Sequence, residues 1–175
     1  MMKEEVKKLI EEKVLVERIK ELAEQINKDY EGKKLHLICV LKGSVFFTCE
    51  LAKHLTMPVT MDFMSLSSYG DGLTSSGCIT INQDLVMPIE GKEVLLIEDI
   101  VDSGRTLSYL RHMLEKRNPK TFEICSLLDK PVCRVNPVEV KYVGFEVEDK
   151  FIVGYGLDYA QKYRNLPYIG ELILE

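Results

Sequence analysis

The chain has 175 residues, of which 46% are apolar, and a formal net charge of −5 at pH 7. A chain of this length is expected to form one domain whose core buries roughly 70% of the unfolded surface. The acidic balance argues against a protein that coats nucleic acid or an anionic membrane, because those partners require clustered positive charge.

The N-terminal stretch MMKEEVKKLI carries charges where a signal peptide needs an uninterrupted apolar segment. No run in the chain approaches the roughly 18 apolar residues of a membrane-spanning helix. The five cysteines are widely spaced and include no C-x-x-C pair, so neither a disulfide framework nor a zinc site is indicated. The sequence therefore predicts a cytoplasmic protein.

Apolar runs and helical patterns alternate along the chain. Helical spacing predicts helices over residues 17–30, 44–55 and 106–117. Short apolar or alternating runs predict strands at residues 35–41, 59–65, 94–99, 122–128, 140–147 and 151–157. Strands separated by helices indicate an α/β fold with a mostly parallel sheet and helices on both faces. No linker interrupts this pattern, so residues 1–175 are expected to form a single domain.

Residues 94–107 read VLLIEDIVDSGRTL and carry the main functional signal. Glu98 and Asp99 fall at the predicted end of a strand, and ligands of open parallel sheets bind beyond that end. The DSGRT turn that follows offers consecutive backbone N–H groups, a glycine and two hydroxyls ahead of a helix, which favours an anion site of monophosphate size. The turn matches neither the Walker A pattern nor G-x-G-x-x-G, which argues against ATP and dinucleotides.

A ligand that suits both the acids and the turn carries a phosphate at one end and carboxylate-binding groups nearby. A ribose 5-phosphate fits, with its phosphate on the turn and its 2- and 3-hydroxyls donating to Glu98 and Asp99, and so does bound magnesium. The alternative is a solvated acidic loop ahead of an ordinary helix. Two adjacent acids alone would favour the solvated loop. The complete segment, with its phosphate-binding turn, favours the ligand site.

The same segment resembles the signature of the type I phosphoribosyltransferases. Over nearly the whole chain, further segments resemble the bacterial hypoxanthine-guanine phosphoribosyltransferases, in order and at similar spacing: CVLKGSVFF, DFMSLSSYG, LLDKP, YVGFEV and KFIVGYGLDYAQKYRNLPYIG. The resemblance implies the type I phosphoribosyltransferase fold with a small hood from the N- and C-terminal segments, and a homodimer or homotetramer. Before residue 20 the chain is a few residues shorter than is usual in that family.

By this resemblance the protein transfers ribose 5-phosphate from phosphoribosyl pyrophosphate to N9 of hypoxanthine or guanine, giving IMP or GMP and pyrophosphate. Glu98 and Asp99 would stabilise positive charge that develops on the ribose ring. Asp102 is placed like the family's catalytic base for the purine N7 proton, although an aspartate before a helix can also be an N-cap. Mg²⁺ is the implied cofactor, with Glu98, Asp99 and Asp158 as metal-side carboxylates.

The resemblance also assigns the remaining substrate contacts. Lys42, Gly43 and Arg164 would bind pyrophosphate. Lys130 would donate to the purine 6-oxygen, Phe151 would stack on the base, and Ile152 would offer its backbone to the purine edge. The phosphate turn contributes Asp102, Ser103, Gly104, Arg105 and Thr106, of which Arg105 receives no specific role. Each residue alone is more often structural, but their ordered co-occurrence indicates one shared site.

Two backbone features are expected near the pyrophosphate. Residues 65–77, SLSSYGDGLTSSG, are predicted to form a mobile lid, because small polar residues and three glycines leave little to bury. Ser68 and Tyr69 match the family's lid tip and would reach the pyrophosphate. The resemblance further implies a strained, cis peptide bond between Leu41 and Lys42.

Two other functions are compatible with parts of this pattern. A regulator could sense phosphoribosyl pyrophosphate while binding RNA or DNA, but the acidic balance opposes it and 175 residues leave no room for a helix-turn-helix domain. An orotate or adenine phosphoribosyltransferase would share the phosphate turn but is not expected to share LLDK and KFIVGYGLDY. The sequence does not decide the preference among hypoxanthine, guanine and xanthine, nor between dimer and tetramer.

Overall fold

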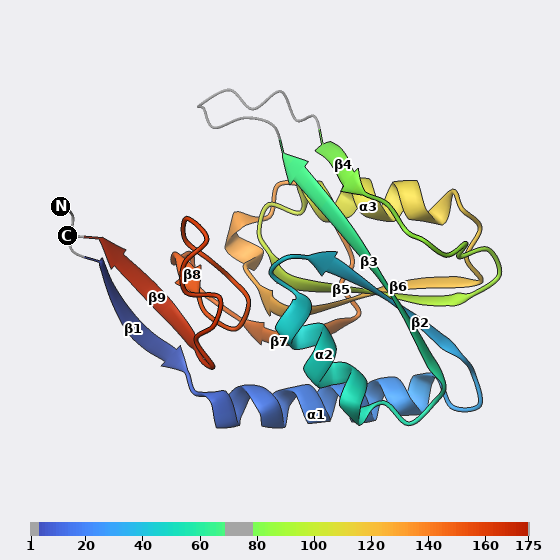
Figure 1. Ribbon diagram of the computed structural model, residues 1–175, viewed down its shortest axis with the longest axis horizontal. Helices are drawn as coiled ribbons and strands as arrows, with labels where there is room; N and C mark the ends of the chain where they lie inside the picture. Colours follow the sequence, from blue (N-terminus) through green and yellow to red (C-terminus); the bar gives the residue numbers. More distant parts are fainter. Residues whose placement is uncertain (1–3, 69–78, 175) are drawn as a thin grey trace.

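The computed structural model describes residues 4–68 and 79–174 (Figure 1). Its centre is a six-stranded sheet in the order β4-β3-β2-β5-β6-β7. The strands are β2 (Leu35–Leu41), β3 (Val59–Ser68), β4 (Ile79–Gln83), β5 (Glu93–Val101), β6 (Thr121–Asp129) and β7 (Tyr142–Glu146). All neighbours are parallel except β3 and β4, which are antiparallel. This is the mostly parallel sheet that the alternating pattern predicted.

Helices cover both faces of the sheet (Figure 1). α1 (Glu12–Asp29) and α2 (Val45–His54) pack on one face, and α3 (Arg105–Glu115) packs on the other. Side chains of β5 alternate between the two cores: Leu95 and Ile97 join the core under α1 and α2, whereas Val94 and Leu96 join the core under α3. Continued by two residues, this period-two alternation directs Glu98 toward the α3 face and Asp99 toward the other face; it does not extend to Val101, which joins the core under α3.

The two ends of the chain form a second, smaller sheet beside the first (Figure 1). β9 (Ile169–Leu174) pairs antiparallel with both β1 (Glu4–Ile10) and β8 (Ile152–Val153). The hood expected from the terminal segments is therefore present. The strand over residues 4–10 was not predicted, because four charges in seven residues hide any alternation.

Several boundaries differ from those expected. β5 continues to Val101, so Glu98 and Asp99 lie within the strand rather than at its end. Residues 65–68 pair with β4, a strand that was not predicted, so the first part of the expected lid is a strand, and the rest of it lies outside the described residues. The strand predicted over residues 151–157 covers only Ile152 and Val153, because Gly154, Tyr155 and Gly156 have positive φ values.

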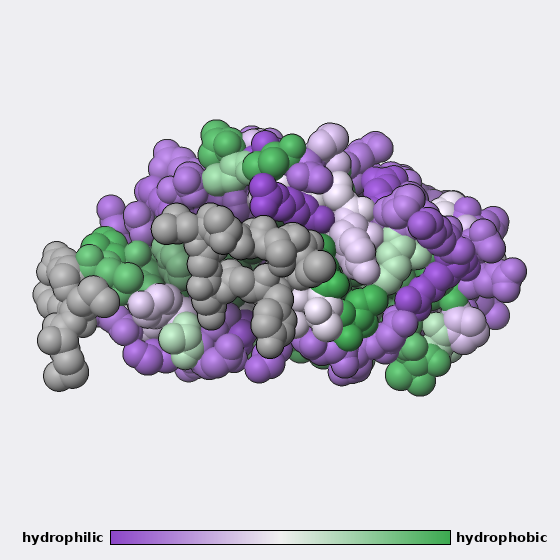
Figure 2. Space-filling model, turned by 90° about the horizontal axis from the view of Figure 1, so that it is seen from above, coloured by the Kyte–Doolittle hydropathy of each residue, from purple (hydrophilic) through white to green (hydrophobic). Residues whose placement is uncertain are grey.

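The surface is mostly polar on the side that Figure 2 shows, and hydrophobic side chains form only small, separate groups there. Within residues 4–68 and 79–174, no helix is both long and apolar enough to cross a membrane.

Candidate active site

A cavity of about 190 Å³ lies at the carboxyl end of β5, where the phosphate turn begins α3. Glu98, Asp102, Ser103, Gly104 and Thr106 are among the residues that line it. Gly104 has φ of 78° and precedes the first helical residue, and a Cβ there would lie 2.4 Å from a backbone oxygen. Only glycine fits this position without strain, which brings backbone N–H groups close to any ligand in the cavity.

The loop after β6 supports the turn from behind. The Ser103 carbonyl accepts hydrogen bonds from the backbone N–H groups of Val135 and Asn136, both at 2.9 Å. The Ser103 hydroxyl accepts one from the Arg105 N–H at 3.4 Å. The N-cap of α3 is Gly104, without a side-chain cap, so the interpretation of Asp102 as an N-cap is wrong. Its exposed carboxylate is left to face the cavity.

Glu98 and Asp99 point to opposite faces of β5, as strand alternation requires. Glu98 is buried and lines the cavity on the α3 side. Asp99 lies on the other face against Gly43, where a Cβ would be 1.5 Å from Asp99 Oδ2. Burial and the neighbouring Asp99 carboxylate raise the pKa of Glu98 well above its usual range. Burial also raises the pKa of Asp99, although the nearby positive charge of Arg164 acts to lower it.

A second group of side chains assembles beside Asp99, where β2 ends. The peptide bond between Leu41 and Lys42 is cis, as expected. Lys42 Nζ and Arg164 Nη2 both donate to Gln161 Oε1, at 3.3 and 3.4 Å. Asp158 accepts from Arg164 Nη2 at 2.7 Å and from the Gln161 backbone N–H at 2.8 Å. Two cations therefore converge on one neutral amide oxygen, an arrangement that an anionic ligand could take over.

The backbone in this region is tightly packed and strained. A Cβ at Gly156 would lie 2.0 Å from the Gly43 carbonyl oxygen, and Arg164 Nη1 donates to the Gly156 carbonyl at 2.7 Å. Among the described residues, four of the five non-glycine residues with positive φ lie between Tyr155 and Tyr163. Such strain is concentrated at functional sites, because the surrounding structure must hold it in place.

The third part of the site joins the end of β6 to the hood. Lys130 is 7% exposed, its backbone N–H donates to the Val101 carbonyl at 2.8 Å, and its Nζ donates to the Lys150 carbonyl at 2.6 Å. Phe151 is 52% exposed and meets the Tyr159 ring edge-on, with 5.5 Å between centroids. An unstacked aromatic face thus stands near a buried ammonium group.

Sequence reasoning missed two residues that tie these parts together. Gln161 carried no motif signal, since its role depends on Arg164 nearby and on Lys42 from a distant segment. Cys133 follows LLDKP, and partial desolvation together with the Asp149 and Asp102 carboxylates raises the pKa of its thiol to about 11. This contact places Asp102 next to Asp149, whose Oδ1 is 3.5 Å from Lys130 Nζ. The phosphate turn and the lysine at the end of β6 therefore belong to one site.

Comparison with known proteins agrees with this geometry. The phosphoribosyl transferase domain family matches residues 5–160. A hypoxanthine-guanine phosphoribosyltransferase of Streptococcus thermophilus is 49% identical over 173 residues, which cover 98% of this chain and 96% of the relative. The chain belongs to this phosphoribosyltransferase family.

Solved structures of phosphoribosyltransferases have the same fold. A Bacillus anthracis hypoxanthine-guanine phosphoribosyltransferase, solved with HEPES in its active site, has a TM-score of 0.92 and 46% identity, covering 97% of this chain and all of that one. A Trypanosoma cruzi hypoxanthine phosphoribosyl transferase, studied for its oligomeric state, has a TM-score of 0.90 and 43% identity, covering 95% and 91% of the two chains. The type I phosphoribosyltransferase fold expected from the sequence is confirmed.

Most of the predicted site residues of this phosphoribosyltransferase lie in the three parts described above. Tyr69 and the side chain of Ser68 lie outside the described residues. Ile152 is buried in β8, so only its backbone can serve a ligand. In the described part of the chain, no group of three or more His, Cys, Asp or Glu side chains is arranged to hold a metal ion. Glu98, Asp99 and Asp158 therefore do not form a site that is complete with protein ligands alone.

Proposed function

We propose that the protein transfers ribose 5-phosphate from phosphoribosyl pyrophosphate to N9 of a 6-oxopurine, giving IMP or GMP and pyrophosphate in purine salvage. The observation that carries this proposal is the buried Lys130 ammonium, which donates to the carbonyl of Lys150, the residue before the exposed Phe151. A donor, an aromatic face and a phosphate cradle at one sheet end match the three parts of a purine nucleotide.

The ribose 5-phosphate binds at the 190 Å³ cavity. Its phosphate accepts hydrogen bonds from the backbone and hydroxyls of the turn, with Gly104 allowing close approach and with Ser103, Arg105 and Thr106 around it. Glu98 accepts from the ribose hydroxyls, and its carboxylate stabilises the positive charge that the ribose ring develops as the pyrophosphate leaves.

Asp102 acts as the catalytic base. As purine N9 forms its bond to the anomeric carbon and the bond to pyrophosphate breaks, the N7 proton passes to the Asp102 carboxylate. The side chain suits this role because it is exposed at the cavity and makes no cap.

Lys130 and Phe151 select the base. The Lys130 ammonium exchanges its hydrogen bond to the Lys150 carbonyl for one to the purine 6-oxygen. Phe151 stacks on the purine ring, and the Ile152 backbone pairs with the purine edge.

The pyrophosphate group binds where Lys42 and Arg164 now share Gln161 Oε1. Its oxygens are better acceptors for the two cations than the neutral amide, so they displace it. The backbone at Gly43 would approach the same group, and Ser68 and Tyr69 are assigned to it by the family resemblance alone.

Mg²⁺ is the proposed cofactor, and the donor chemistry fits it. Asp99, Asp158 and Glu98 would supply carboxylate oxygens to it. Magnesium is commonly bound by one or two carboxylates plus substrate phosphates and water, rather than by a complete protein cage. When bound, it neutralises negative charge on the leaving pyrophosphate.

We further propose a cytoplasmic homodimer or homotetramer. Phe46 on α2 is 43% exposed and Val14 on α1 is 51% exposed, and Phe46 stands 6.1 Å from the Tyr155 ring. A second copy of the chain would cover this apolar surface. Sedimentation equilibrium of the parent and of Phe46→Lys tests it: an unchanged, monomeric mass in both contradicts the proposal.

Steady-state turnover with phosphoribosyl pyrophosphate, Mg²⁺ and each of hypoxanthine, guanine, xanthine, adenine and orotate tests the activity. We expect IMP and GMP from the first two, and little product from adenine or orotate. A preference for adenine or orotate would contradict the substrate assignment. Titration with RNA and DNA at low salt separates the enzyme from a nucleic-acid-binding regulator, for which binding would be salt-dependent.

A further inference from the structure

A second, larger cavity lies at the opposite end of the sheet, where β2, β5 and β6 begin. Its volume is about 480 Å³, within the range of small-molecule sites. It is lined by residues 32–36, 58–60 and 91–93, together with Met87 and Lys120. None of these residues belongs to the active site. The seven residues of β2 separate the two cavities by about 20 Å.

The lining of this amino-end cavity is strongly basic in a protein of net charge −5. It contains one carboxylate, Glu93, and four lysines, namely Lys33, Lys34, Lys92 and Lys120. Glu93 is neutralised by Lys120, whose Nζ is 2.8 Å from Glu93 Oε1. Within residues 4–68 and 79–174, neither Lys34 nor Lys92 has a carboxylate oxygen within 4 Å of its Nζ. Two ammonium groups are therefore available to an anion at this cavity.

A buried histidine adds a polar atom that the protein does not use. His36 is 1% exposed, and its Nδ1 lies 2.8 Å from the Thr60 hydroxyl oxygen. Its Nε2 is buried and has no hydrogen-bond partner in the described part of the chain. When the Thr60 hydroxyl donates to Nδ1, the Nε2–H is a donor without an acceptor on a residue that lines the cavity. A buried donor without an acceptor is unfavourable, so a ligand oxygen would be stabilised there.

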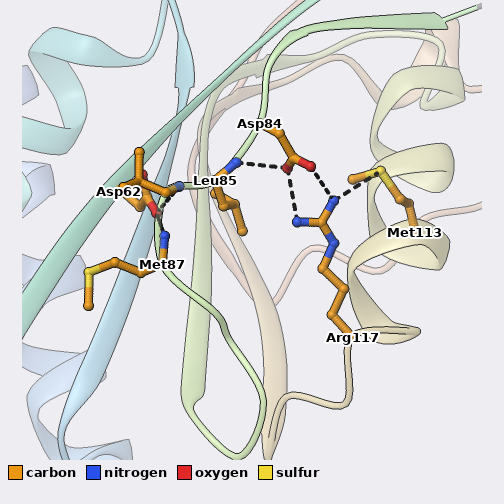
Figure 3. A network of polar contacts seen from close by, with 7 residues as sticks. Asp62, Asp84, Leu85, Met87, Met113 and Arg117 are labelled. Carbon is orange, nitrogen blue, oxygen red and sulfur yellow. Dashed lines mark hydrogen bonds and ion pairs between the residues drawn. The ribbon is translucent and has the colours of Figure 1, made fainter.

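Besides Glu93, the acid that acts on His36 in the described part of the chain is Asp62, and its oxygens already have hydrogen-bond donors. Asp62 lowers the positive potential around the ring, but its two carboxylate oxygens accept the backbone N–H groups of Phe63, Val86 and Met87 at 2.8 to 2.9 Å. Figure 3 shows Asp62 reaching the segment that carries Met87, and Asp84 pairing with Arg117 beside it. Asp62 therefore holds the backbone of Met87, which lines the cavity, and does not neutralise the lysines of the cavity.

The remaining walls are held by backbone hydrogen bonds. Leu35 N–H donates to the Pro58 carbonyl at 3.0 Å, and Lys120 N–H donates to the Lys92 carbonyl at 2.8 Å. These bonds set the positions from which the lysines project. The cavity is therefore formed before any ligand arrives, which reduces the entropy lost on binding.

We propose that the amino-end cavity binds a phosphorylated small molecule. Its phosphate accepts from Lys34, Lys92 and His36 Nε2, and its organic part packs against Pro58 and Met87. A bare phosphate would fill only a small part of 480 Å³, so a nucleoside monophosphate is a better match in size. Because the cavity lies at the other end of β2, its occupant makes no contact with the reacting atoms.

The ring nitrogen signals of histidine provide a direct test, since the chain has only three histidines. Inorganic phosphate and AMP are titrated separately at constant pH and ionic strength, with ¹H–¹⁵N spectra of the imidazoles recorded. We expect a saturable shift of His36 Nε2 without a matching shift of His54 or His112. Tighter binding of AMP than of phosphate supports use of the whole cavity, and equal binding supports a phosphate site alone. No saturable shift of His36 with either probe overturns the proposal.

Substitutions distinguish specific binding in the cavity from nonspecific attraction of anions by surface lysines. Lys34→Ser/Lys92→Ser removes the two available ammonium groups and is expected to weaken binding roughly 2- to 30-fold. Lys7→Ser/Lys13→Ser makes the same charge change at exposed positions outside the cavity and is expected to bind as the parent does. Equal affinity in all three proteins, or equal weakening in both variants, overturns the proposal. His36→Asn, measured by titration calorimetry, gives an independent check: unchanged affinity removes His36 from the site.

Discussion

The two ends of β5 carry buried glutamates with opposite electrostatic surroundings. Glu93 begins the strand, and hydrogen bonds from Lys120 and from the Thr121 hydroxyl hold the pKa of its carboxyl below the usual range. Glu98 lies five residues further along, where burial and the Asp99 carboxylate raise its pKa well above the usual range. Both side chains expose little surface, but desolvation is the main cause of the raised pKa of Glu98, whereas at Glu93 two hydrogen bonds outweigh it.

The difference lies in what the protein supplies as a partner. At the amino end the fold provides a cation and a hydroxyl for the acid, and the carboxylate is satisfied in the folded chain itself. At the carboxyl end, residues 4–68 and 79–174 give Glu98 no cationic partner, so a ligand must satisfy it. Perturbed, unpaired acids of this kind mark functional sites. At the amino end of the sheet the buried acid is therefore satisfied by protein groups, and at the carboxyl end it is satisfied only when substrate binds.

The largest expected effect is at the carboxyl end. Asp102→Asn keeps the shape of the side chain and removes its basicity, so we expect kcat for hypoxanthine to fall about 10²- to 10⁴-fold. Binding of phosphoribosyl pyrophosphate, measured by calorimetry, should change little. The matched variant at the amino end, Asp84→Asn, should keep the parent kcat. Nearly full activity of Asp102→Asn would show that another group takes the proton.

Base selection should respond next most strongly. The Lys130 ammonium can only donate, so it pairs with the 6-oxygen of hypoxanthine and meets a second donor in the 6-amino group of adenine. Lys130→Gln supplies an amide that can turn either face, and we expect the hypoxanthine-to-adenine ratio of kcat/KM to fall about 5- to 150-fold. Lys120→Gln is the control at the amino end. An unchanged ratio in Lys130→Gln would limit Lys130 to support of the strand end.

The parts of the fold that could be predicted are those with strong local patterns. β2 is apolar except for His36 because it is covered on both faces, and the phosphate turn is recognisable from consecutive residues. β1 could not be predicted, since its pairing with β9 comes from the other end of the chain and its own seven residues carry four charges. Its stability is tertiary rather than local.

The site shows the same division. Residues within one motif, such as Asp102 and Gly104, were found because their spacing has a meaning of its own. Gln161 was missed because its oxygen matters only where Lys42 and Arg164 meet it, 119 and 3 residues away in sequence. The lysines of the amino-end cavity were missed for the same reason, since only the strand order brings their segments together.

The two glutamates make a sharper test through folding stability. Glu98 has a raised pKa in the folded state, so its stabilisation is complete below the unfolded pKa of about 4.3 and is lost as pH rises. Glu98→Gln should therefore raise the free energy of unfolding at pH 7, by about 1 kcal/mol. Glu93 has a lowered pKa, so its stabilisation is present at neutral pH and is lost as pH falls through the folded value. Glu93→Gln should be destabilising at pH 7.

Urea unfolding from pH 4 to pH 8 measures both glutamates in one series. The difference between each variant and the parent should shrink toward acid pH, from opposite sides. If both variants lowered stability at pH 7, the two ends of β5 would not differ in the way that their contacts indicate.

The smallest expected effect concerns the ion pair beside the amino-end cavity. Asp84 accepts from Arg117 Nη1 at 2.9 Å and from Nη2 at 2.8 Å (Figure 3), but the Asp84 side chain is 49% exposed. Exposed pairs contribute little, because water and salt screen them. A double-mutant cycle with Asp84→Asn and Arg117→Gln, read by urea unfolding, should give a coupling energy of about 0.2 to 1 kcal/mol that declines in 1 M salt.

Turnover of all four proteins should be equal, because the pair supports the amino end of the sheet and not the reacting groups. A loss of kcat in Arg117→Gln with stability unchanged would mean that the two ends of the sheet are coupled in catalysis.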